Sequence, residues 1–142
     1  MSTRRLLLFR SAGQVFGVDA DTAREILPGH AATRIPGAAP AVRGLINVRG
    51  TLVTLVDVAL AMGLATGTAT AGGAVVLLDH GTHRVGLVVD EVLDLVVVGE
   101  GDLDAGGALP GVRPDLVRAV GVAGGRSFVE LASDTLLEPL LP

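Results

Sequence analysis

Residues Pro40 to Asp57 read P-A-V-R-G-L-I-N-V-R-G-T-L-V-T-L-V-D and contain two Arg-Gly steps six residues apart. Apart from these steps, Arg43-Gly44 and Arg49-Gly50, the stretch has the composition of two consecutive β-strands. Glycine permits a turn, a bulge or a close backbone approach that a residue with a Cβ resists. An arginine beside such a turn carries five donors in a fixed arrangement, suited to a partner's carboxylates or carbonyls. Because no nucleophile, general base or metal ligand accompanies them, the stretch predicts a protein that binds other proteins.

Short runs of Val and Leu separated by turn residues continue on both sides of this stretch, which is typical of small β-barrels and sandwiches. Two turns join such runs directly, namely His80-Gly81-Thr82-His83 and Gly124-Gly125. We expect strands near Leu6–Phe9, Gln14–Val18, Gly44–Val48, Leu52–Val56, Ala74–Leu78, Arg84–Val89, Leu95–Val98, Ala119–Ala123 and Ser127–Leu131.

Short helices are expected where local signals for helix ends occur. Thr22 and Glu25 have the spacing of a capping box, and Pro28 would end that helix after about two turns. The other expected helices are Val58 to Met62, with Asp57 as its cap and Gly63 as a left-handed C-cap, and one that follows Ser133 or Asp134 and ends at Pro139.

The composition excludes several classes of protein. The chain has 142 residues, a formal net charge of −4 and a mean hydropathy of +0.59. Its longest apolar run, Val85 to Val98, is interrupted by acidic residues and falls short of the ~20 apolar residues that a membrane span needs. The basic residues are scattered arginines and the only aromatic residues are phenylalanines, which argues against a nucleic-acid partner. The absence of cysteine fits a cytoplasmic location, and we expect no direct membrane insertion.

Two clusters could be mistaken for metal sites. His80 and His83, together with Asp79, have a spacing that can hold zinc, but no further ligand lies nearby, so a polar hairpin turn is the preferred interpretation. Asp102 and Asp104 resemble part of a calcium loop but lack its closing glutamate, so an exposed acidic loop is the preferred interpretation. We therefore expect neither a metal nor a cofactor.

No catalytic motif is present in the sequence. Asp90 and Glu91 are adjacent carboxylates at a strand end, and neighbours in a strand point to opposite faces, so they cannot easily flank one bond. Asp90 is expected to accept hydrogen bonds from the backbone where the strand turns. Glycine-rich phosphate-binding signatures and a nucleophile elbow are also missing. The chain is therefore not expected to be an enzyme.

Several segments, taken in order, carry a resemblance to a known family. They are A-T-R-I-P at 32–36, P-A-V-R-G-L-I-N-V-R-G-T-L-V-T-L-V-D-V at 40–58 and H-R-V-G-L-V-V-D-E-V at 83–92, followed by the hairpin from Gly121 to Leu131 and a last short helix. In these segments the chain resembles the CheW family, the scaffold proteins of bacterial chemotaxis. The resemblance implies a mostly β fold of two five-stranded, SH3-like barrels side by side, with a few short helices and a groove between the barrels.

The resemblance covers nearly the whole chain, so we expect one CheW-like domain over residues 1–142. The Gly- and Ala-rich stretch Ala65–Gly73 splits the chain near its middle. We therefore expect a first barrel at about 14–70 and a second at about 71–132, with the terminal segments 5–10 and 133–140 closing the barrels.

The function that the resemblance implies is that of a non-catalytic adaptor. In the family, one barrel docks on the regulatory domain of the histidine kinase CheA, and the groove region takes the cytoplasmic tip of a chemoreceptor. The protein would thus be cytoplasmic and recruited to membrane-associated receptor arrays. The short chain, without phosphoacceptor or ATP-binding motifs, is expected to be the stand-alone form of the module.

Carried over by position, the resemblance also implies site residues. Arg49 matches the receptor-contacting arginine of the family, although an arginine at this place can also simply solvate the surface. The residues in segments that line or support this surface are Glu25, Ile26, Asn47, Gly50 and Val92, of which Ile26 and Val92 could equally be core residues. Gly44 matches a glycine on the kinase-facing side, and Gly86 and Asp90 match structural positions.

The chain also departs from the family pattern. Thr54 stands where the family usually has proline, and Ala23 and Pro28 lie in the segment that supports the receptor surface. Two alternatives stay open: the same fold serving a kinase pathway other than chemotaxis, or a small-ligand-binding barrel that uses the groove between the lobes as a pocket.

Overall fold

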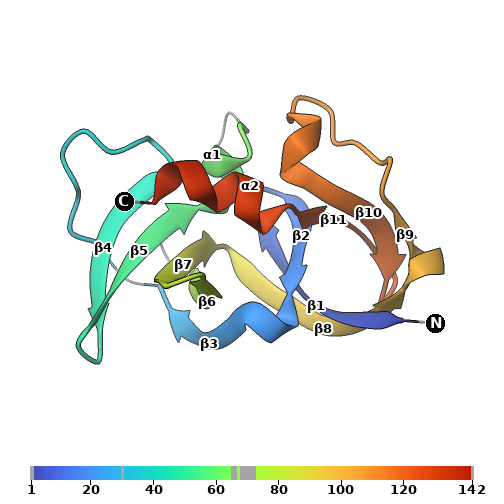
Figure 1. The fold of residues 1–142 in the computed structure, drawn as a ribbon, viewed down its shortest axis with the longest axis horizontal. Coiled ribbons are helices and arrows are strands. Elements are labelled where there is room, and N and C mark those ends of the chain that lie inside the picture. The colour runs from blue at the N-terminus through green and yellow to red at the C-terminus, as the bar shows by residue number, and fades with distance from the viewer. Residues whose placement is uncertain (1, 30, 65–66, 68–72, 142) are drawn as a thin grey trace.

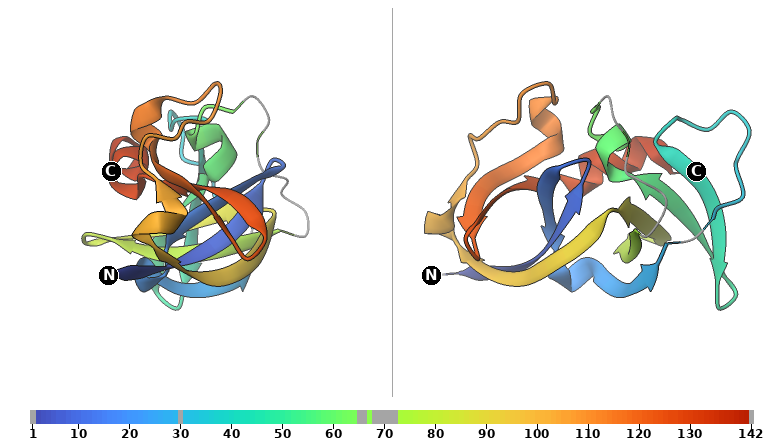
Figure 2. Two further views of the ribbon diagram at one scale, coloured as in Figure 1. Left: turned by 90° about the vertical axis from the view of Figure 1, so that its right-hand side faces the viewer. Right: turned by 180° about the vertical axis from the view of Figure 1, so that it is seen from behind.

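The computed structural model describes residues 2–29, 31–64, 67 and 73–141. It consists mainly of two curved, mostly antiparallel β-sheets that lie side by side (Figures 1 and 2). The five-stranded sheet has the order β3 (Ala23–Pro28), β6 (Ala74–His80), β7 (His83–Val89), β5 (Thr51–Asp57) and β4 (Val42–Val48). The six-stranded sheet has the order β8 (Glu91–Gly99), β1 (Thr3–Ser11), β2 (Gln14–Asp19), β11 (Arg126–Leu131), β10 (Val117–Ala123) and β9 (Leu103–Asp104). This arrangement confirms the expected mostly β fold with two units.

The helices are short and serve as connections. The α-helices are α1 (Val58–Ala61) and α2 (Ser133–Leu137), and the 3-10 helices are Ala20–Thr22, Glu100–Asp102, Pro114–Leu116 and Glu138–Leu140. Helix α1 begins as expected, because the Asp57 side chain accepts a hydrogen bond from the backbone of Leu60, and Gly63 follows with a φ of +84°. Helix α2 lies across the junction of the two sheets in Figure 1, close to where the sequence predicts it.

The helix predicted from Thr22 to Pro28 is wrong, because this segment forms strand β3 after a single 3-10 turn. The cap of that turn is Asp19, which accepts from the backbone N–H of Asp21, while the Thr22 hydroxyl donates to the Asp19 carbonyl. The segment pairs with β6 along its length, and Ile26 lies opposite Val76. The capping-box spacing is a local signal, and pairing with a strand fifty residues away outweighs it.

The expected division into lobes at residue 70 does not follow the strand pairing. Strands β6 and β7 were expected in the second barrel, but they pair with β3 and β5 in the five-stranded sheet, while β2 pairs with β1 and β11. The chain starts in the six-stranded sheet, builds the five-stranded sheet from residues 23–89, and then returns. The stretch Ala65–Gly73, most of which lies outside the described residues, connects strands within one sheet, and its composition alone cannot distinguish such a connection from a linker.

The largest hydrophobic cluster is shared by both sheets and joins them. Phe9 and Phe16 of the six-stranded sheet, with ring centroids 6.1 Å apart, belong to the same cluster as Val76 and Leu87 of the five-stranded sheet. Leu137 of helix α2 is buried in the same cluster. Two smaller clusters fill the interiors of the individual sheets. Since aliphatic burial contributes about 25 cal/mol per Å² of apolar area, this shared core fixes the two sheets relative to each other.

Candidate protein-binding surface

The second Arg-Gly step forms the turn between strands β4 and β5. Val48 pairs with Thr51, which leaves Arg49 and Gly50 as a two-residue turn with φ values of +49° and +86°. Turns of this kind match the twist of the flanking strands and favour Asn or Gly at both positions. Arginine in the left-handed region is therefore unusual, and such a residue costs of order 1–2 kcal/mol. The Asn47 side chain supports the turn, because its Oδ1 accepts from the backbone N–H of Gly50 at 2.8 Å.

The Arg49 side chain is held in a bidentate ion pair with Glu25 of strand β3. Nη2 lies 2.5 Å from Oε1 and Nη1 lies 3.2 Å from Oε2. Strands β3 and β4 are the two edges of the five-stranded sheet, so this pair connects its opposite edges. The hydrogen bond from Arg49 lowers the pKa of the Glu25 carboxyl, and the charges of Arg49 and Arg84 act in the same direction. The pair fixes the direction of an arginine that is 68% exposed.

The remaining expected receptor-surface residues divide between this region and the core. Ile26 follows Glu25 on β3, points to the opposite face of the strand and is 50% exposed. Val92 lies on β8 in the other sheet and packs, partly buried, against the shared cluster. The structure therefore brings Asn47, Arg49, Gly50 and Glu25 together with Ile26 beside them, and it puts Val92 among the supporting residues of the core.

The first Arg-Gly step, Arg43-Gly44, has a structural role. The Arg43 guanidinium donates to the buried Asp57 carboxylate, with Nη2 at 2.6 Å and Nε at 3.2 Å from Oδ2. The other oxygen of Asp57 caps helix α1. Because Asp57 is inaccessible to solvent, its charge requires this partner. The two arginines of the motif thus have different tasks, since Arg43 holds the fold and Arg49 faces outward.

Gly44 is buried at a bulge in strand β4, where its φ is +138°. A Cβ at this position would lie 2.2 Å from the carbonyl oxygen of Thr33. Thr33 in turn forms an isolated bridge with Leu45 through two backbone hydrogen bonds of 2.9 Å. Gly44 therefore presents no surface of its own, and any change there acts on a partner through the segment around Thr33.

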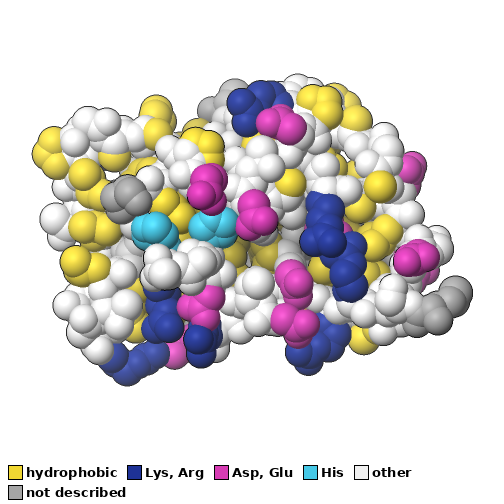
Figure 3. All heavy atoms as spheres, viewed as in Figure 1, with side chains coloured by type: hydrophobic (Ala, Val, Ile, Leu, Met, Phe, Trp, Pro, Cys, Tyr) yellow, Lys and Arg dark blue, Asp and Glu magenta, His cyan; other side chains and the backbone are white. Residues whose placement is uncertain are grey.

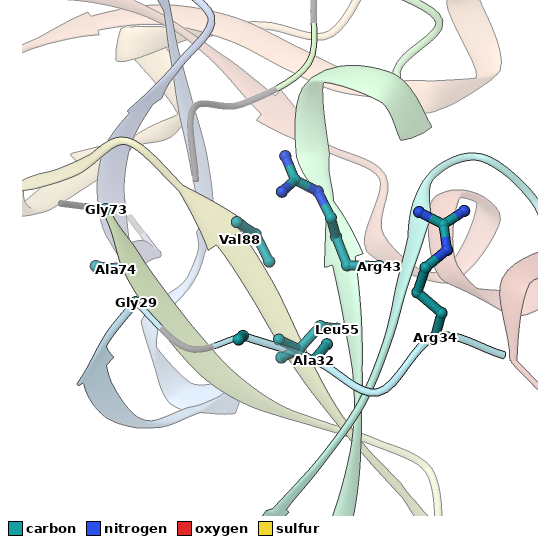
Figure 4. A pocket seen from close by; sticks show the side chains of 9 residues that line it. Gly29, Ala32, Arg34, Arg43, Leu55, Gly73, Ala74 and Val88 are labelled. Atoms are coloured by element: carbon teal, nitrogen blue, oxygen red, sulfur yellow. The ribbon is translucent and has the colours of Figure 1, made fainter. Parts of the chain in front are cut away.

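A cavity of about 360 Å³ lies beside this segment (Figure 4). In the view of Figure 4, Leu55, Ala32 and Val88 form apolar walls, and the side chains of Arg34 and Arg43 rise beside them. The full lining consists of Gly29, Ala31, Ala32, Arg34, Arg43, Leu55, Gly73, Ala74 and Val88. Small residues thus leave a hollow next to the loop that Gly44 supports.

Gly86 and Asp90 occupy tight positions in the backbone. A Cβ at Gly86 would lie 2.5 Å from a methyl group of Leu55 and 2.7 Å from one of Val75, inside the five-stranded sheet. Asp90 Oδ2 accepts from the backbone N–H of Ala12 at 2.8 Å, in the turn between β1 and β2, where Ala12 has a φ of +50°. The expected backbone hydrogen bond of Asp90 is confirmed.

The side chains whose spacing resembles a metal site in the sequence have other partners. Asp79 pairs with Arg24 and Arg84, and His80 Nε2 lies 2.7 Å from Glu138. Asp102 and Asp104 accept hydrogen bonds from the backbone of the turns in which they lie. Over residues 2–29, 31–64, 67 and 73–141, no group of three or more suitable side chains could hold a metal ion.

Comparison with known proteins identifies the family. A model of the CheW-like domain matches residues 5–139. The chain belongs to the CheW-like family. It is 31% identical over 116 residues to the chemotaxis protein CheW of Rhizobium meliloti (strain 1021), which covers 82% of this chain and 73% of that protein. The corresponding protein of Bacillus subtilis (strain 168) is 25% identical over 111 residues, or 78% of this chain and 70% of that one.

The CheW-like fold is also found by comparison of structures. The crystal structure of the scaffolding protein TtCheW from Thermoanaerobacter tengcongensis matches with a TM-score of 0.85, covering 96% of this chain and 94% of that one at 18% identity. This similarity establishes the twin-sheet fold. Within the described part of this CheW-like chain, no helix is long and apolar enough to cross a membrane.

Several charged residues of the CheW-like fold escaped the sequence analysis. Glu130 is buried in strand β11, where Arg4 of β1 donates to both of its oxygens at 2.6 and 2.8 Å. An acidic residue inside the apolar run F-V-E-L is the signal that could have revealed this pair. Arg24 is 55 residues from Asp79 and gives no local signal, whereas Arg84 faces Asp79 across the expected hairpin at His80–His83.

Proposed function

We propose that this chain is a non-catalytic chemotaxis adaptor that couples chemoreceptors to the histidine kinase CheA. Its membership of the CheW-like family, over residues 5–139, is the observation that carries the proposal. The proteins to which it is similar are named as chemotaxis and scaffolding proteins. The chemistry of the site supports the same role, since an arginine on a rigid turn suits the recognition of a partner protein.

The turn Arg49-Gly50 is the proposed receptor contact. Glu25 takes up two donors of the Arg49 guanidinium and orients the rest toward solvent. Asn47 and Gly50 hold the turn, and Ile26, exposed on the opposite face of strand β3, is an additional apolar contact in this proposal. Val92 lies on β8 in the other sheet and packs against the shared core, so it is not part of this contact. Contacts of this kind are modest in area, and clustering of adaptors in a receptor array adds avidity.

The proposed kinase contact lies on the side of Gly44. Because Gly44 is buried under Thr33, the loop that precedes strand β4 would make the contact, with the exposed residues Arg34 and Ile35 at its surface. We place the adaptor on the cytoplasmic side of the membrane, where binding to the receptor tips would recruit it to the arrays. Neither contact requires a cofactor or a reactive group.

The replacement Arg49→Glu tests the receptor contact. We expect normal folding and a loss of co-sedimentation with chemoreceptor arrays, because the charge at an exposed contact is reversed. The double variant Glu25→Arg with Arg49→Glu restores an ion pair at this place but not the outward-facing charge, so it should fold well and still fail to bind.

Arg113→Glu is the matched control, since Arg113 is 67% exposed and forms a similar surface pair, with Asp115 at 3.3 Å. It should bind like the wild type. Wild-type binding by Arg49→Glu would contradict the assignment of Arg49. If the double variant binds again, receptor binding requires an ion pair between positions 25 and 49 for structural reasons and does not require the outward-facing charge of Arg49.

A further inference from the structure

Five charged side chains meet along strand β3, and we call them the β3 charge cluster: Arg24, Glu25, Arg49, Asp79 and Arg84. Two ion pairs converge on Asp79, because Arg24 Nε contacts Oδ2 and Arg84 Nε lies 3.4 Å from Oδ1. The Glu25–Arg49 pair is next to them, and the charge of Arg84 also lowers the pKa of Glu25. Figure 3 shows basic and acidic side chains side by side in the corresponding lower-left part of the molecule, below two histidines.

Two of the three arginines are the outermost members of the cluster, whereas Arg84 is 32% exposed, about as much as its partner Asp79. Arg24 and Arg49 are 59% and 68% exposed, whereas their partners Asp79 and Glu25 are each 35% exposed. With three arginines against two carboxylates, the cluster carries one excess positive charge, although the whole chain has a net charge of −4. An approaching partner therefore meets guanidinium groups, which the carboxylates behind them hold in place.

A hollow at the five-stranded sheet continues the cluster. It has a volume of about 530 Å³, and Arg24, Asp79 and Arg84 form its charged side. Leu45 and Leu52 line it as well, and Leu52 is 64% exposed. Arg24 lies at the register shift of strand β3, between Ala23 and Glu25. The surface thus combines fixed positive charge with exposed apolar side chains.

The ion pairs of the β3 charge cluster contribute little to the folding stability of the chain. Exposed ion pairs contribute about 0–1 kcal/mol each, and two arginines that share one carboxylate compete for it. Both guanidiniums contact the one carboxylate of Asp79 through Nε, so each has further N–H donors that a second carboxylate could accept. The geometry suits the capture of an acidic group from outside.

We infer that the β3 charge cluster and the adjoining hollow bind an acidic segment of the receptor tip, in which a carboxylate lies beside an apolar side chain. The carboxylate contacts the Nη groups of Arg24 and Arg84, and the apolar side chain packs on Leu52. This inference rests on the proposed function and extends the receptor surface from the Arg49 turn to the hollow lined by Arg24, Asp79 and Arg84. Charge complementarity is the reason for choosing an acidic partner.

Binding of the full chain to the cytoplasmic fragment of a chemoreceptor, measured at about 50 and about 300 mM salt, tests the inference. We expect the double variant Arg24→Gln with Arg84→Gln to bind about tenfold more weakly at low salt and to lose most of the salt dependence. Asp79→Asn leaves both arginines and removes their counter-charge, so it should bind the acidic segment more tightly than the wild type. Arg113→Gln is the control for the loss of an exposed arginine and should leave the affinity unchanged.

The outcomes separate the inference from the function on which it rests. If Arg49→Glu abolishes binding and the Arg24 and Arg84 double variant binds like the wild type, the inference is overturned and the adaptor function stands. If Asp79→Asn and the double variant lower the melting temperature equally and neither changes the affinity, the cluster serves stability alone. That result would also overturn the inference. Loss of binding to the CheA regulatory domain instead of the receptor fragment would assign the surface to the other partner. Absence of wild-type binding to the receptor fragment would refute both proposals.

Discussion

Replacing Gly44 with alanine is expected to destabilise the chain far more than the same replacement at Gly50. The new Cβ would lie 2.2 Å from the Thr33 carbonyl oxygen, and the residue would have to keep a φ of +138°. We expect about 1–3 kcal/mol of backbone strain and the loss of the two hydrogen bonds between Thr33 and Leu45, at about 1 kcal/mol each. The sum is about 3–5 kcal/mol.

Gly50 provides the matched control, because it also has a positive φ, +86°, but nothing lies within 4 Å of an added Cβ. Gly50→Ala should therefore show the strain alone, about 1–2 kcal/mol. Urea unfolding of the two variants and the wild type, with a common slope, gives both values.

The comparison also bears on the kinase contact. A Gly44 variant that remains folded should have a displaced Thr33 segment, visible as faster amide exchange at Thr33 and Leu45. Equal losses of stability at Gly44 and Gly50 would refute the reasoning, since they would show that the Thr33 carbonyl moves aside at no cost.

Two further predictions concern the ion pairs. Asp57→Asn should cost about 3–5 kcal/mol in urea unfolding, because it leaves Arg43 without its buried counter-charge, and a loss below about 1 kcal/mol would show that water already compensates that charge. For Glu25, hydrogen bonding to Arg49 lowers the pKa below its ordinary value of 4.5, so the pair stabilises the folded state above that value and ceases to do so as the pH falls through the lowered pKa. The difference in unfolding midpoint between the wild type and Glu25→Gln should therefore narrow from about pH 7 to about pH 3, and a widening difference would contradict this sign.

Strands that carry strong local patterns could be predicted from the sequence. The Val- and Leu-rich runs gave nearly all strands, and the turns at Gly81 and Gly124-Gly125 join the strands that they were expected to join. The Asp57 cap and the glycine after helix α1 were equally local signals. What these elements share is that a few neighbouring residues determine them.

Pairings between distant residues could not be predicted in this way. The segment from Ala23 to Pro28 has a helical signal within itself, but its conformation depends on β6, which lies some fifty residues further along the chain. The two-residue strand β9 has too little sequence to give a pattern. The lobe boundary failed for the same reason, because the parallel pairing of β5 with β7 leaves no trace in composition.

The candidate site shows the same division. The motif N-V-R-G and the family resemblance selected Arg49 and its neighbours, but only the structure pairs Arg49 with Glu25, because that contact joins opposite edges of a sheet. The resemblance also selected Gly44, while its burial under Thr33, and hence its indirect effect on a partner, depends on the bulge in β4.

The path of the chain through the two sheets bears on the order in which they form. Residues 23–89 supply every strand of the five-stranded sheet, so this sheet needs only contacts within one continuous segment. The other sheet must bring Phe16 beside Val129, and closing a loop of that length costs chain entropy before any contact repays it. We therefore expect the sheet with the Arg49 turn to form early and the closure of its neighbour to be the slow step, so that a newly made chain acquires its proposed receptor surface before its ends are joined.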